Sequence, residues 1–223
     1  MTQRLEIKRC DQTTGGRPGP RLVPRRVGLL GGSFNPAHQG HVEISREALK
    51  RLRLDEVWWL VSPQNPLKPT AGMAPLATRL GEASRLAGDR RIRVTAIEAE
   101  LGTRFTADTL AALRRRFPRT RFVWLMGADN LAGISRWERW PQIFHSMPIA
   151  VFARPSYSLR ALAAMAARRF GSRRLPASAA GRLAEREPPA WAFLTGRLNP
   201  VSATAIRGAR RGRKGARAKE VTS

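Results

Sequence analysis

The stretch Gly31-Gly32-Ser33-Phe34-Asn35-Pro36-Ala37-His38-Gln39-Gly40-His41 decides the fold of this chain. A short apolar run at 27–30 precedes it, and residues 42–49 follow it with apolar positions at helical spacing. We therefore predict a turn that leads from a buried strand into a helix. Gly31 and Gly32 let the backbone bend sharply there and approach a ligand closely.

Two histidines, His38 and His41, fall at the predicted start of this helix. Free backbone N–H groups and the positive end of the helix dipole make such a place suitable for a phosphate group. The alternative is a tight turn with two surface histidines. The stretch is not a Walker loop, because no Gly-Lys-Ser/Thr follows, and it lacks the Gly-x-Gly-x-x-Gly spacing of a dinucleotide fingerprint.

Charge and length set the next limits. The chain has 223 residues and a formal net charge of +25. The length favours one domain, predicted at 26–210, with a disordered basic arm at 1–25 and a basic disordered tail at 211–223. So positive a surface favours polyanionic ligands such as nucleotides. Two alternatives remain, namely nucleic-acid binding and an arginine-rich composition that only keeps the surface soluble.

The compartment is suggested by what the sequence lacks. Cys10 is the only cysteine, so neither a disulfide nor a cysteine zinc site can form within the chain. The first residues have no apolar segment typical of a secretory signal, and no run approaches the roughly 18 apolar residues of a membrane span. We expect a cytoplasmic protein that does not associate with membranes.

Strand and helix patterns alternate along the chain. Strands are expected at 26–30, 57–61, 92–94, 122–126, 149–152 and 191–194, and helices at 40–53, 75–87, 106–117, 137–144, 159–170 and 204–210. This alternation predicts an α/β fold, a Rossmann-like doubly wound parallel sheet of about five to six strands with helices on both faces. Because ligands bind beyond the carboxyl ends of parallel strands, the loops 31–41, 62–69 and 127–140 should converge on one crevice.

A second candidate phosphate site lies at 201–207, Val201-Ser202-Ala203-Thr204-Ala205-Ile206-Arg207. Ser202 could cap the helix expected to follow, and Thr204 and Arg207 would share one face of its first turn. Two hydroxyls, free backbone N–H groups and a guanidinium together suit a second phosphate group.

Both stretches resemble motifs of the nucleotidylyltransferase superfamily with the (H/T)xGH motif. The first resembles its Gly-Gly-Ser-Phe-Asn-Pro-x-His-x-Gly-His signature, and 201–207 resembles the I-S-x-T-x-I-R motif that holds the β- and γ-phosphates of ATP, with Val201 in place of Ile. The resemblance implies catalytic roles for His38, His41 and Arg207. It also implies an ATP site made of Gly32, Ser33, Phe34, His38, His41, Asp129, Ser202, Thr204 and Arg207.

Three further stretches resemble one branch, the nicotinate-nucleotide adenylyltransferases. Gly127-Ala128-Asp129 followed by Trp137 resembles the G-x-D…W motif, residues 105–110 match (Y/F)-T-x-D-T-L, and 154–157 match R-P-G-Y with Ser in place of Gly. The resemblance covers residues 26–210. It implies that ATP and nicotinate mononucleotide are joined to give deamido-NAD and pyrophosphate, a step of NAD biosynthesis.

The resemblance also implies individual roles. His38, His41 and Arg207 would neutralise charge on the α-phosphoryl and the leaving group, and Ser202 and Thr204 would hold the pyrophosphate. Asp129 would accept a hydrogen bond from the ATP ribose. The residues expected to bind the mononucleotide are Lys68, Thr106 and Trp137. Mg2+ would be carried by the ATP phosphates, and no carboxylate cluster dedicated to a metal is evident.

Each of these roles has a structural alternative. Asp129 and Thr106 could be helix caps, Trp137 a core residue and Lys68 a solvated loop charge. The whole chain has alternatives too, either a related adenylyltransferase that uses nicotinamide mononucleotide or phosphopantetheine, or a nucleic-acid-binding protein. Nucleic acid is not required for the predicted reaction, although the basic tails would allow weak non-specific binding.

Overall fold

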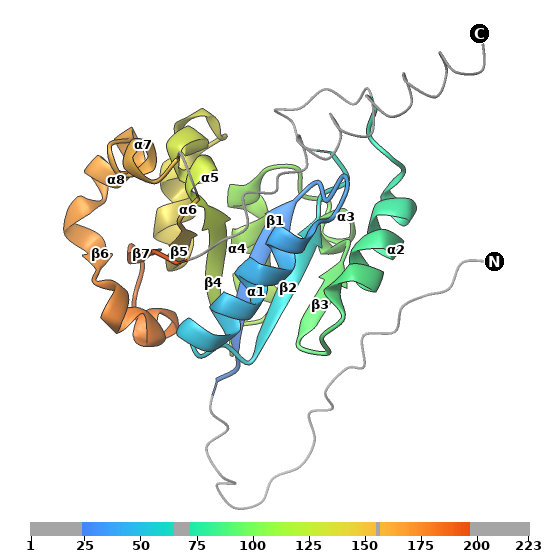
Figure 1. The fold of residues 1–223 in the computed structure, drawn as a ribbon, viewed down its shortest axis with the longest axis horizontal. Helices are drawn as coiled ribbons and strands as arrows, with labels where there is room; N and C mark the ends of the chain where they lie inside the picture. Colours follow the sequence, from blue (N-terminus) through green and yellow to red (C-terminus); the bar gives the residue numbers. More distant parts are fainter. Residues whose placement is uncertain (1–23, 65–71, 155–156, 197–223) are drawn as a thin grey trace, which may run out of the picture.

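One parallel sheet organises the part of the chain that the computed structural model describes, residues 24–64, 72–154 and 157–196 (Figure 1). Its seven strands lie in the order β3-β2-β1-β4-β5-β7-β6, and every pair is parallel. The strands are β1 (Arg26–Gly32), β2 (Glu56–Val61), β3 (Ile92–Thr95), β4 (Arg121–Gly127), β5 (Ile149–Phe152), β6 (Arg174–Leu175) and β7 (Trp191–Leu194). The predicted fold class is confirmed, and the strand that the sequence did not indicate is the two-residue edge strand β6.

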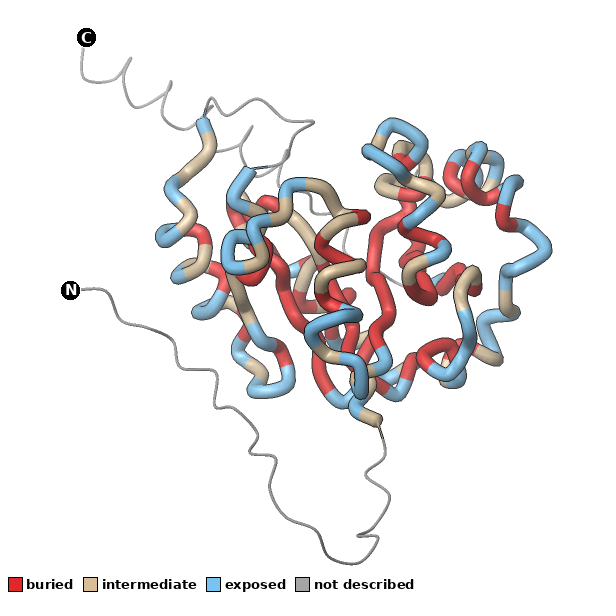
Figure 2. Tube along the Cα trace, turned by 180° about the vertical axis from the view of Figure 1, so that it is seen from behind, coloured by how far each residue is buried: buried red, intermediate tan, exposed pale blue. Residues whose placement is uncertain are grey.

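Helices cover both faces of this sheet. On one face lie α1 (Gln39–Arg51), α2 (Leu76–Ala87) and the 3-10 segment η3 (Ala177–Glu185). On the other lie α3 (Ile97–Glu100), α4 (Thr106–Arg116), α5 (Ala128–Gly133), the 3-10 turn η1 (Ile134–Arg136), α6 (Trp140–Ser146), α7 (Ser158–Leu162) and α8 (Met165–Arg169). A further 3-10 turn, η2, spans Gly171–Arg173. Figure 2 shows the consequence, buried central strands between partly exposed helices.

The continuous apolar runs of the sequence follow from burial on both faces. All six residues of β2 are buried. Trp58 and Leu60 pack into the cluster under α4, whereas Val57, Trp59 and Val61 pack into the cluster under α1. Because successive side chains of a strand point to opposite faces, both sets must be apolar when both faces are covered.

Two expected helices differ from those observed. The helix expected at 137–144 begins at Trp140, because Pro141 is favourable in a first turn but would break a helix that began at 137. The helix expected at 159–170 is interrupted at Ala164, whose backbone is extended. Its buried residues Ala161 and Ala166 are five apart, and a continuous helix would turn them to different sides.

The chain order places a topological switch point at the carboxyl ends of β1 and β4. From β1 the chain runs to β2 and β3 on one side, then returns to β4 on the other side of β1. Such a change of direction leaves an open position beyond the strand ends, where ligands bind in α/β proteins. The expected loops at 31–41 and 127–140 both start here.

Some predictions lie outside the described residues. These are the arm up to residue 23, the tail after 210 and the terminal helix expected at 204–210. None of the helices in the described part of the chain is long and apolar enough to span a membrane.

Candidate active site

The turn after β1 is built around a buried aromatic ring. Phe34 is 2% exposed and has a left-handed backbone, with φ of 46°. Its ring stacks on Trp59 of β2, with centroids 5.1 Å apart, and contacts the ring of His41 at 4.5 Å. Phe34 therefore supports His41 from below, and Ser33 beside it is also buried. Both residues were expected at the ATP site, and here they are buried beside the two histidines.

His41 is held from both its ring and its backbone. The backbone N–H of His38 donates to Nδ1 of His41 at 3.1 Å, so the neutral ring carries its proton on Nε2. Ser45 Oγ donates to the His41 carbonyl at 2.8 Å, and Trp59 Nε1 donates to Ser45 Oγ at 2.7 Å. The sequence reasoning missed Ser45 and Trp59. Ser45 sits one helical turn after His41, and that spacing was the available signal.

His38 lies just before α1, with its ring centroid 3.9 Å from that of His41. Only 5% of the residue is exposed, and this burial lowers the pKa of His38 to about 4. The positive charge of Arg154 lowers the pKa further, while the carboxylates of Asp129 and Glu43 raise it. His38 is therefore uncharged at neutral pH in the free protein.

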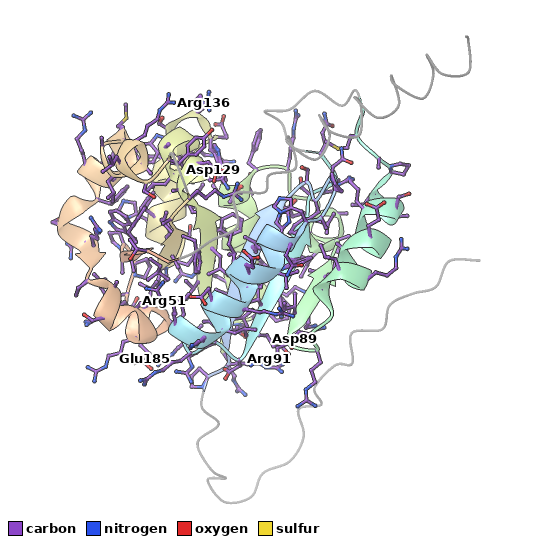
Figure 3. The ribbon with its side chains drawn as sticks, in the orientation of Figure 1. Arg51, Asp89, Arg91, Asp129, Arg136 and Glu185 are labelled. Atoms are coloured by element: carbon purple, nitrogen blue, oxygen red, sulfur yellow. The ribbon has the colours of Figure 1, made fainter. Side chains whose placement is uncertain are left out.

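Asp129 faces this pair of histidines from the end of β4. Its Oδ1 lies 3.2 Å from Nε of Arg154, which follows β5. A Cβ at residue 127 would come closer than 3.0 Å to Oδ1 of Asp129, so a larger residue there would displace this carboxylate. Gly127, not Asp129, is the N-cap of α5, so the helix-cap alternative for Asp129 is wrong. In Figure 3 Asp129 lies at the end of the sheet opposite to Asp89 and Glu185.

Arg154 is a site residue that the sequence reasoning did not identify. Its side chain is 19% exposed, and its charge acts on both His38 and Asp129. The signal was present in the match of residues 154–157 to R-P-G-Y, which was used only as a family marker. The guanidinium adds positive charge to the crevice at a place where phosphates are expected.

Thr106 and Trp137 lie in stretches that the structure brings side by side. Asp108 of α4 and Arg139, two residues after Trp137, form an ion pair with Nη2 and Oδ2 2.5 Å apart. The same guanidinium lies 6.0 Å from the ring centroid of Phe105. Thr106 is the first residue of α4 and Phe105 is its N-cap, so the cap alternative for Thr106 is wrong. Trp137 is half-buried and packs on the apolar cluster under α4.

The structure thus gathers part of the predicted site. Gly32, Ser33, Phe34, His38, His41 and Asp129 meet where β1 and β4 end. Lys68, Ser202, Thr204 and Arg207 lie outside the described residues. Among the residues that the structure describes, no group of three or more His, Cys, Asp or Glu side chains could hold a metal ion.

One more titratable group lies near the crevice. Glu98 of α3 is 9% exposed, and burial raises its pKa to about 7, although a hydrogen bond with Ser62 acts in the opposite direction. Ser62 follows β2, so this carboxyl touches the second of the expected site loops. No motif in the sequence pointed to Glu98.

The sequence matches one protein family and a set of named relatives. The cytidylyltransferase-like family matches residues 29–209. Two relatives named nicotinate-nucleotide adenylyltransferase come from Cereibacter sphaeroides and Parvibaculum lavamentivorans and are 59% and 55% identical to this chain. The first match covers 81% of this chain and 95% of the relative, and the second covers 82% and 90%.

A solved structure shares the fold. Plasmodium falciparum nicotinic acid mononucleotide adenylyltransferase complexed with NaAD superposes with a TM-score of 0.62, over 82% of this chain and 83% of that one. The sequence identity is 14%, so this likeness bears on the fold alone.

Proposed function

This chain belongs to the nicotinate-nucleotide adenylyltransferases of the cytidylyltransferase-like family, and we propose that it joins ATP and nicotinate mononucleotide. The products are deamido-NAD and pyrophosphate, in a step of NAD biosynthesis. The observation that carries the proposal is the pair His38 and His41 after β1, facing Asp129 and Arg154 at the ends of the neighbouring strands.

The reaction is a displacement at the α-phosphorus of ATP. A phosphate oxygen of nicotinate mononucleotide forms a bond to that phosphorus, and the bond to the bridging oxygen of pyrophosphate breaks. The nucleophile is already an anion, so no general base is required. The protein instead has to align two polyanions and stabilise the charge that develops as the bond breaks.

The two histidines can supply that stabilisation. His41 presents Nε2–H, because its Nδ1 already accepts the His38 backbone N–H. His38 is neutral in the free protein, and a bound polyanion would favour its protonated form because opposite charges raise the pKa of a histidine. Charge on His38 would thus increase as the phosphates bind.

The other ATP-binding roles follow from the resemblance. Asp129 would accept from the ribose hydroxyls, since its carboxylate is held at the crevice beside Arg154. Ser202 and Thr204 would hold the leaving pyrophosphate, and Arg207 would stabilise charge on it. Mg2+ would enter with the ATP phosphates and neutralise part of their charge.

The mononucleotide would lie on the side of α4. Trp137 would stack on the pyridine ring, backbone N–H groups near Thr106 would bind the carboxylate, and Lys68 would contact the phosphate. The ion pair between Asp108 and Arg139 supports this assignment, because it ties the stretch of Thr106 to that of Trp137. The reaction needs no nucleic acid, and its proposed location is the cytoplasm.

A substrate panel tests the proposal. Purified protein is mixed with ATP, Mg2+ and one of nicotinate mononucleotide, nicotinamide mononucleotide or phosphopantetheine, and pyrophosphate release is measured. We expect the highest kcat/KM with nicotinate mononucleotide. Equal or greater turnover with either of the others would contradict the proposed substrate, and no release with any of them would contradict the reaction.

A further inference from the structure

A buried arginine lies beneath the turn that carries the histidines. Arg79, in the first turn of α2, is 2% exposed and is among the largest fully buried side chains of the described residues. Its burial lowers the pKa of the guanidinium below the ordinary value. A buried cation is costly unless its donors are satisfied and its charge is compensated.

Every donor that Arg79 uses is directed at a main-chain carbonyl. Nη1 donates to the carbonyls of Ser33 and Ser62, at 2.7 Å each. Nη2 donates to Pro63 at 2.9 Å, and Nε donates to Ala74 at 2.8 Å. No carboxylate forms an ion pair with Arg79 within the described part of the chain. Four of its N–H groups thus donate to carbonyl oxygens, and no carboxylate of the described residues balances the charge.

These four bonds join segments that the sheet alone leaves separate. The ladder between β1 and β2 extends as far as the bond from Ser62 N–H to the Gly32 carbonyl, at 2.9 Å. Arg79 continues the connection one residue further, to Ser33. Asn35 strengthens it, since Nδ2 donates to the Gly72 carbonyl at 3.1 Å and Oδ1 accepts from Ala74 N–H at 3.3 Å. The turn is therefore fixed to the end of β2 and to the start of α2.

We propose that Arg79 is a positioning residue for adenylyl transfer, which fixes Ser33 and the turn up to His41 in the geometry that the phosphates require. The inference rests on the proposed function. The planar guanidinium suits the task, because its rigid fork reaches four carbonyls at once, whereas a lysine ammonium has three donors around one point. The positive charge also suits this place, because a bound polyphosphate would lie close to the turn that Arg79 holds.

The size of the effect follows from geometry. Loss of the fork allows Ser33 to move relative to β2, and displacement of a reacting group by about 1 Å costs about 100-fold in rate. We expect Arg79→Lys to lower kcat about 100-fold while KM for ATP changes little. Arg85→Lys is the matched control. Arg85 is exposed on the same helix, and among the described residues its side chain donates only to the Gly81 carbonyl, at 3.3 Å, so its variant should retain the wild-type kcat.

The experiment measures pyrophosphate release per folded molecule, well below the melting temperature of each variant. A lower melting temperature of Arg79→Lys with unchanged kcat per folded molecule would assign Arg79 a purely structural role and overturn the proposal. No change in either quantity would overturn it as well. Activity that is absent from the wild type as well would instead contradict the proposed function. The Arg85→Lys protein and the wild type therefore separate the two failures.

Chemical rescue gives a second readout. Arg79→Ala leaves a cavity of the shape of the side chain, and added guanidinium ion should restore part of kcat, whereas ammonium ion at the same concentration should not. Guanidinium destabilises folded proteins at high concentration, so recovery at low concentration is not a stability effect. A folded Arg79→Ala protein that guanidinium does not reactivate would contradict the requirement for the fork.

Discussion

The depressed pKa of His38 predicts how the stability of the protein depends on pH. The pKa is about 4 in the folded chain against 6.5 for an exposed histidine, because 95% of the residue is removed from water. Between these values the unfolded chain binds a proton that the folded chain does not. The stability due to neutral His38 is therefore complete above about pH 6.5 and is lost as the pH falls towards 4.

The magnitude follows from the two pKa values. Lowering the pH from 7 to 5 should remove about 2 kcal/mol from the free energy of unfolding through His38 alone. Glu98 acts in the opposite direction, because its pKa of about 7 makes the folded state retain a proton that the unfolded chain releases above about pH 4.5. The wild-type curve should thus be shallow, and variants are needed to separate the two groups.

The assay is urea unfolding of the wild type and of His38→Gln at pH 5, 6 and 7. We expect the difference in unfolding free energy, wild type minus variant, to decrease by about 2 kcal/mol from pH 7 to pH 5. The charged groups that act on His38, namely Asp129, Glu43 and Arg154, are present in both proteins. A difference that stays constant with pH would show that His38 titrates alike in both states, and would refute the reasoning.

Three further predictions concern stability and specificity. In the same urea series, the unfolding free energy of Glu98→Gln should rise by about 2 kcal/mol relative to that of the wild type as the pH increases from 5 to 7. A difference between the two proteins that does not change with pH would contradict the raised pKa. Gly31→Ala should lower the free energy of unfolding by about 1–3 kcal/mol, because the added Cβ would come closer than 3.0 Å to the Trp124 ring. The control Gly81→Ala lies in α2, where a Cβ has no atom within 4 Å, and it should not be destabilised. Trp137→Ala should weaken binding of nicotinate mononucleotide by about 1 kcal/mol or more and leave ATP binding unchanged in separate titrations, whereas equal losses for both ligands would assign Trp137 to the core.

The parallel sheet and the position of its switch point were predictable because their signals are local. The apolar runs at 57–61 and 122–126 are long enough to require burial on both faces, and the histidine turn lies directly after a strand. The rule that ligands bind beyond the carboxyl ends of strands then brings residues 31–41 and 127–140 together without any knowledge of distant contacts.

Features that depend on packing between distant segments were not predictable. The ion pair of Asp129 with Arg154 joins the ends of two strands, and the four bonds of Arg79 join the turn after β1 to both ends of the loop between β2 and α2. Neither leaves a periodic signal in the sequence. The edge strand β6 has two residues and pairs only with β7, and the break at Ala164 depends on what Ala161 and Ala166 pack against.

The most direct test of the central claim is pyrophosphate release from ATP and nicotinate mononucleotide, measured for the wild type and for His41→Ala under the same conditions. We expect robust release by the wild type and a loss of about 3 kcal/mol of transition-state stabilisation in the variant, seen as a fall of 100-fold or more in kcat/KM per folded molecule. Near-wild-type turnover by folded His41→Ala would contradict the assignment of the histidine turn as the site of adenylyl transfer.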